Sequence, residues 1–112
     1  MVQFAFIIPS TTNKRDEWKQ AEDSYLWTIL CSSLEKYTPD IGNRRIKLFI
    51  GFDEDDRIYS IEEERMKFSA VFMNFDIEWF PQPVETKGKV TTIWNNVGKE
   101  ALAQGYDYIK IL

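Results

Sequence analysis

Short apolar runs alternate along the chain with stretches of helical periodicity. The apolar runs end at polar or proline-containing segments and have the length of buried β-strands. Between them, apolar residues recur at steps of three and four, the spacing that places side chains on one face of an α-helix. The predicted strands are residues 4–9, 45–51, 76–80 and 106–112.

Three helices are predicted between these strands. The first spans residues 16–37. The second begins at Ser60, with Glu63 completing a capping box, and the third ends before Gly105, a residue suited to a C-terminal cap. The predicted apolar stripes are Leu26, Ile29, Leu30, Leu34 and Tyr37; Ile61, Phe68 and Phe72; and Val90, Ile93, Trp94, Val97 and Ala101.

The resulting order, β-α-β-α-β-α-β, is typical of an α/β domain. It predicts a Rossmann-like, three-layer αβα arrangement with a mostly parallel sheet. The 112 residues correspond to a single domain. The chain stops on the apolar strand 108–112, which would expose unpaired backbone groups at a sheet edge. We therefore expect a fold truncated after its fourth strand, or a strand that pairs with the remainder of the chain or with another copy of it.

Composition narrows the possible chemistry. The net charge of −4 disfavours nucleic acid as a partner, because nucleic-acid binding relies on lysine and arginine. The absence of histidine excludes Ser-His-Asp and Cys-His catalysis. The single cysteine, Cys31, is expected to be a buried, inert thiol. No signal peptide and no apolar run of about 20 residues are present, so a membrane span is not expected and a cytoplasmic location is favoured.

Polar residues follow each of the first three predicted strands. Because ligands of open parallel sheets bind beyond the carboxyl ends of the strands, we expect these residues to converge on one edge. Carboxylates there would accept hydrogen bonds from a base or ribose, and lysines would meet a diphosphate. The candidate nucleotide-binding residues are Pro9, Ser10, Thr11, Thr12, Asp53, Asp55, Lys87, Lys89 and Asn95.

The same residues allow other interpretations. The acidic run 53–56 is also compatible with a solvated turn, and Asp53-Glu54-Asp55 with a metal site. The segment 87–89 is either a solvated loop or a phosphate contact at a helix N-terminus. It resembles the end of a P-loop, but Val90 and Pro83 break that pattern.

The order of these predicted strands, helices and polar segments resembles that of the amino-terminal half of glycosyltransferases with the GT-A fold. In that family the first strand ends in a nucleotide-holding loop that often starts at a proline, which matches Pro9, Ser10 and Thr11. The second strand ends in an acid that contacts the base or ribose, which matches Asp53 or Asp55. The resemblance covers essentially the whole chain. It implies binding of a nucleoside diphosphate sugar.

In that family the fourth strand runs into a metal-binding pair of aspartates, and this sequence ends before that point. The resemblance therefore implies a divalent metal, Mn or Mg, and sugar transfer only in the complete protein. The alternative is a non-catalytic α/β protein-interaction module that uses residues 108–112 as a pairing edge. A phospho-acceptor receiver domain needs paired acids after the first strand, and a dinucleotide-binding domain needs G-x-G-x-x-G there; this chain has neither.

Overall fold

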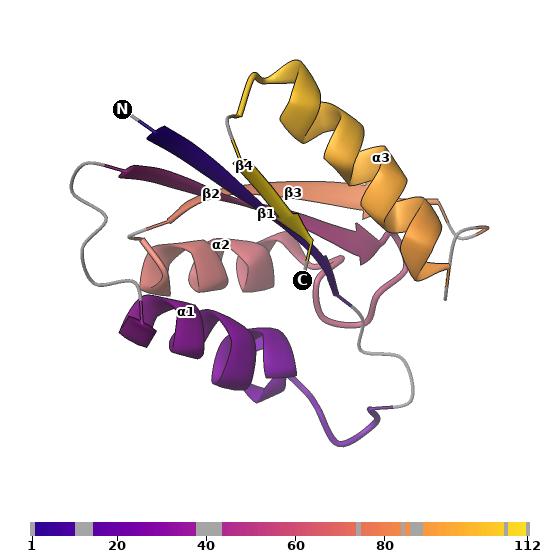
Figure 1. Ribbon diagram of the computed structural model, residues 1–112. Coiled ribbons are helices and arrows are strands. Elements are labelled where there is room, and N and C mark those ends of the chain that lie inside the picture. The colour runs from indigo at the N-terminus through magenta and orange to yellow at the C-terminus, as the bar shows by residue number, and fades with distance from the viewer. Residues whose placement is uncertain are drawn as a thin grey trace.

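A four-stranded parallel sheet forms the centre of the protein (Figure 1). The computed structural model describes residues 2–10, 15–37, 44–73, 75–83, 85, 89–106 and 108–111. The strand order is β3-β2-β1-β4, and all three neighbouring pairs are parallel, as the sequence predicts. The strands are β1 (Val2–Ser10), β2 (Arg44–Asp53), β3 (Asp76–Gln82) and β4 (Tyr108–Ile111).

Helices cover both faces of the sheet, which confirms the three-layer arrangement (Figure 1). Between β1 and β2 lie a 3₁₀ turn, η1 (Ala21–Asp23), a π-helix, η2 (Leu26–Cys31), and α1 (Ser32–Tyr37). On the same face, α2 (Glu62–Val71) connects β2 to β3, whereas α3 (Val90–Ala103) covers the opposite face and leads to β4. The chain thus proceeds from β1 outward in one direction to β3, and then returns to place β4 on the other side of β1.

Each face of the sheet has its own apolar core. Successive strand residues point to opposite faces, so Leu48 and Ile50 pack with α1 and α2, while Ile7 and Phe49 pack with α3. Burial on both faces explains why the strands appear in the sequence as continuous apolar runs. The larger core is rich in aromatic rings; Phe68, for example, packs edge-to-face against Trp27 and Trp79.

The first predicted helix is shorter and less regular in the structure. Residues 16–20 are not helical, because the Asp23 carboxylate accepts hydrogen bonds from the backbone N–H groups of Lys19 (2.9 Å) and Gln20 (3.2 Å). The π-helix that follows has more residues per turn than an α-helix. Ile29 is therefore 56% exposed, and its prediction as a core residue is wrong, whereas Cys31 is fully buried as predicted.

The second helix also begins differently. The predicted capping box at Ser60 is wrong, because α2 begins at Glu62 and Ile61 occupies the N-cap position. Ser60 belongs to the preceding turn, where its backbone N–H donates to the carbonyl oxygen of Asp56 (3.2 Å). Glutamates in the first turn of α2 instead complement the helix dipole. Phe68, from the predicted stripe of this helix, is buried.

Ile61, from the predicted stripe of the second helix, is 45% exposed, whereas the predictions for the third helix agree with the structure. Ile93, Val97 and Ala101 of α3 are buried, and Gly105 has a φ of +76°, as a C-terminal cap requires. The third strand continues through Pro81 rather than ending before it, which an edge strand tolerates.

Candidate functional site

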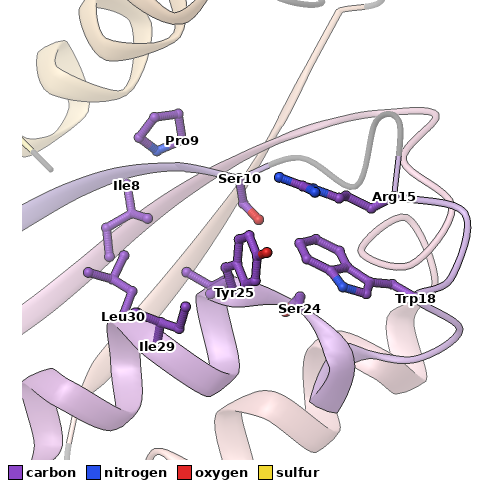
Figure 2. A pocket seen from close by; sticks show the side chains of 10 residues that line it. Ile8, Pro9, Ser10, Arg15, Trp18, Ser24, Tyr25, Ile29 and Leu30 are labelled. Carbon is purple, nitrogen blue, oxygen red and sulfur yellow. The ribbon is translucent and has the colours of Figure 1, made fainter.

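A pocket of about 450 Å³ opens beside the carboxyl end of β1, on the face covered by η2 (Figure 2). Apolar side chains from β1 and η2 form much of its wall, and polar groups lie toward the loop that follows β1. Of the lining residues that the structure describes, only Arg15 is charged. The lining residues are Ile8, Pro9, Ser10, Arg15, Trp18, Ser24, Tyr25, Leu26, Ile29 and Leu30.

Arg15 extends over two aromatic rings toward the Ser10 side chain (Figure 2). Its guanidinium carbon lies 5.1 Å from the ring centroid of Tyr25 and 5.6 Å from that of Trp18. The two rings meet edge-to-face, with centroids 4.8 Å apart. Cation–π attraction of this kind stabilises one guanidinium position. Within the described part of the chain, no carboxylate forms an ion pair with this guanidinium.

Arg57, in the loop after β2, holds the backbone of the segment that carries Arg15 and Trp18. Its guanidinium donates to the carbonyl oxygens of Arg15 (2.5 Å) and Trp18 (3.0 Å). The loop itself is shaped by Asp56, whose carboxylate accepts hydrogen bonds from the backbone N–H groups of Ile58 (3.2 Å) and Tyr59 (2.9 Å). Asp56, the last residue of the acidic run, thus has a structural role in the loop that carries Arg57.

Helix α2 fixes the same wall from a second direction. The backbone N–H of Ala21 donates to the Glu64 carboxylate at 2.8 Å. Lys67 forms ion pairs with Glu22 (2.5 Å) and Glu64 (2.9 Å). The hydrogen bond from Lys67 is the main reason that the pKa of Glu64 lies below its ordinary value.

Ser24 connects the pocket to the aromatic core. Its hydroxyl donates to the carbonyl oxygen of Ala21 (2.8 Å) and lies 2.5 Å from the hydroxyl of Tyr59. Tyr59 is fully buried, and this burial raises the pKa of its phenol above the ordinary value. Tyr59 therefore acts as a neutral hydrogen-bonding group.

The predicted site residues of β1 and β2 lie at the same edge of the sheet, but their side chains point to opposite faces of it. Ser10 pairs in register with Phe52 and lies at the pocket, beside Pro9. Phe52 packs with the α1 and α2 core, so the next residue, Asp53, points toward α3 and is 3% exposed. Asp55 is exposed in the turn that follows. The sheet therefore separates the Asp53 carboxylate from the pocket.

The remaining predicted residues lie elsewhere or cannot be placed. Lys89 is the exposed N-cap residue of α3, and Asn95 is exposed on the same helix. At this edge the neighbouring residue, Asn96, donates to the side-chain oxygen of Gln82 at the end of β3 (3.1 Å). Three further predicted residues, Thr11, Thr12 and Lys87, lie outside the described residues.

Arg15, Trp18 and Tyr25 are not among the candidate residues predicted from the sequence. The only feature of the sequence that could have indicated a role in binding was their position directly after the polar loop of the first strand. Among the residues described by the structure, no group of three or more His, Cys, Asp or Glu side chains could hold a metal ion, so the Asp53-Glu54-Asp55 metal interpretation gains no support. None of the described helices is long and apolar enough to cross a membrane.

Comparisons with protein-family models, with curated proteins and with solved structures find no match to this chain.

Proposed function

We propose that this chain is the nucleotide-sugar-binding portion of a glycosyltransferase-like protein. The complete protein would transfer a sugar from a nucleoside diphosphate donor to an acceptor hydroxyl. The observation that carries the proposal is the position of the pocket at the carboxyl end of β1, where the strand order changes direction between β1 and β4. Open α/β sheets bind their ligands at such a point.

The chemistry of the pocket supports the same proposal. Small-molecule sites are concave and mostly apolar, with a few polar groups that fix the orientation of the ligand. Here Tyr25, Ile29 and Leu30 supply apolar surface, and Ser10 and Arg15 supply polar groups. A nucleotide combines a planar base with an anionic tail, and so matches both parts.

Asp55, in the turn after β2, and Lys89, at the N-cap of α3, are exposed but do not line this pocket, so the proposal gives them no contact with its ligand. A divalent metal, Mn or Mg, would act in the complete protein as a Lewis acid on the leaving diphosphate. Two or three hydrogen bonds to charged groups, less the cost of association, correspond to affinity of about 1 mM.

Titration followed by amide chemical shifts tests the proposal at this affinity. UDP and GDP are added to the isotopically labelled protein in a buffer without phosphate. The expected result is a saturable shift of the amides of Ile8, Ser10 and residues 15–30, with little change around α2 and β3. Absence of saturable shifts up to about 20 mM nucleotide, well above the expected dissociation constant, would contradict the proposal. Binding tighter than about 1 μM would show that the site has been misplaced.

The alternative, a non-catalytic interaction module, is favoured by a different observation. Tyr25 and Ile29 lie one helical turn apart and are 49% and 56% exposed. In the described sheet, β4 pairs with β1 only, so its other edge is open to a further strand. Light scattering separates the two proposals, because a stable dimer that ignores nucleotides favours the module.

A further inference from the structure

The geometry points to Arg15 as the residue that anchors the phosphates of the bound nucleotide. This inference rests on the proposed function and deepens it, because it assigns the anionic part of the ligand to one side chain. A guanidinium presents a planar fork of N–H donors that matches two phosphate oxygens at once.

Charge complementarity supports this assignment. Among the described residues that line the pocket, Arg15 carries the only charged side chain, although the chain as a whole carries a net charge of −4. Its guanidinium has no carboxylate partner among the described residues, so its N–H groups remain available to a ligand. The pocket therefore favours an anion on chemical grounds.

Two aromatic rings favour one position of the Arg15 guanidinium, although the residue itself is exposed. Contacts with the rings of Trp18 and Tyr25, at 5.6 Å and 5.1 Å, direct it across the pocket toward Ser10 (Figure 2). Arg57 fixes the backbone of the same segment through two carbonyl oxygens. Contacts that favour this position of the guanidinium reduce the conformational entropy that is lost when a ligand is held.

The apolar part of the pocket favours a nucleotide over a simple anion. Tyr25 and Ile29 line the wall and are 49% and 56% exposed. A base or ribose that covers these side chains removes apolar surface from water, which inorganic phosphate or pyrophosphate cannot do. The occupant we infer is therefore a nucleoside phosphate, held by Arg15 at its phosphates and by the apolar wall at its nucleoside.

Three variants and three ligands test this inference. Arg15→Ala removes the guanidinium, Arg15→Lys keeps the charge without the fork, and Lys99→Ala is the matched control. Lys99 is an exposed lysine on α3, on the opposite face of the sheet, so its replacement makes the same change in net charge. Each protein is titrated with UDP, uridine and pyrophosphate in the presence of EDTA, with amide chemical shifts as the readout.

Arg15→Ala is expected to weaken UDP binding by about 10-fold or more, the loss typical of a hydrogen bond to a charged group. Uridine affinity is expected to change by less than about twofold, because uridine lacks the phosphates. Arg15→Lys should retain part of the UDP affinity, and Lys99→Ala all of it. The amide spectrum of each variant reports whether the fold is intact.

Other outcomes separate this inference from the proposed function. Equal UDP affinity in the wild-type protein and Arg15→Ala, or an equal loss for UDP and uridine, would overturn the role of Arg15 and leave the proposed function standing. A wild-type protein that binds pyrophosphate through Arg15 but ignores UDP would overturn both the nucleoside phosphate and the proposed function. Absence of binding of UDP and pyrophosphate alike would also overturn both.

Discussion

Alanine in place of Gly51 tests how closely α3 packs on the sheet. A Cβ atom built at this position of β2 would lie 2.7 Å from Cγ2 of Ile93 and 3.1 Å from Cγ2 of Val97. Both methyl groups belong to β-branched side chains, which have few alternative rotamers in a helix. The helix must therefore move away from the sheet to admit the extra methyl group.

The magnitude follows from two opposing effects. Overpacking of a core costs about 1–3 kcal/mol. The loss of glycine freedom in the unfolded chain offsets about 0.4–1 kcal/mol of this. Gly51→Ala is therefore expected to lower the free energy of unfolding by about 1–2 kcal/mol, which corresponds to a fall in Tm of roughly 4–10 °C.

Gly98 provides a matched control on the same helix. Apart from the adjacent backbone of α3, no atom of the described residues lies within 4 Å of a Cβ atom built at Gly98, which is in the interior of α3. Gly98→Ala is expected to raise the free energy of unfolding by about 0.5–1 kcal/mol, because alanine favours a helix interior. The same chemical change thus has opposite effects at two positions.

Urea unfolding followed by circular dichroism measures both variants, together with Ile93→Ala and the double variant. The double variant should be less destabilised than the sum of its single changes, because Ile93→Ala removes the nearer methyl group. A Gly51→Ala protein as stable as the wild type, or strictly additive changes, would refute the close contact between α3 and β2.

Three further predictions concern the polar contacts behind the pocket. Arg57→Ala is expected to lower stability by about 1–2 kcal/mol and to speed amide hydrogen exchange in residues 18–24, and unchanged exchange would contradict its role in holding this segment. Tyr59→Phe removes the hydroxyl partner of Ser24 and is expected to cost about 1 kcal/mol in urea unfolding; no loss would show that this hydrogen bond is not stabilising. The pKa of Glu64 in the folded protein lies below its ordinary value of 4.5, mainly through the hydrogen bond from Lys67, so its stabilising effect is present above pH 4.5 and is lost as the pH falls through the lower, folded value. Glu64→Gln should therefore show a shallower loss of stability below pH 4.5, and an identical slope in both proteins would count against this linkage.

Local patterns in the sequence determine most of the architecture. Continuous apolar runs predict strands buried on both faces, and their alternation with helical stripes predicts the parallel, three-layer arrangement. The apolar stripe of α3 predicts that Val97 is buried, and Gly105 marks the end of the helix. Both signals come from residues that are close together in the sequence.

The candidate site depends on contacts between distant parts of the chain. The wall that carries Arg15 is held by Arg57 and Glu64, which are 42 and 43 residues away from the groups that they bind. The pattern of apolar and polar residues within residues 15–24 gives no indication of such contacts. The π-helix likewise exposes Ile29 in a stripe that α-helical spacing would bury.

The sequence by itself determined that the strands alternate with helices in a parallel sheet. It also determined that polar residues follow the carboxyl ends of the first three strands. The tertiary structure alone decided the faces on which those residues lie. Ser10 and Asp53 end adjacent strands, yet their registers differ by one residue, and a shift of one residue turns a strand side chain to the opposite face. The pocket therefore receives its charge from Arg15, a residue of the following segment, rather than from the acid that the sequence indicates.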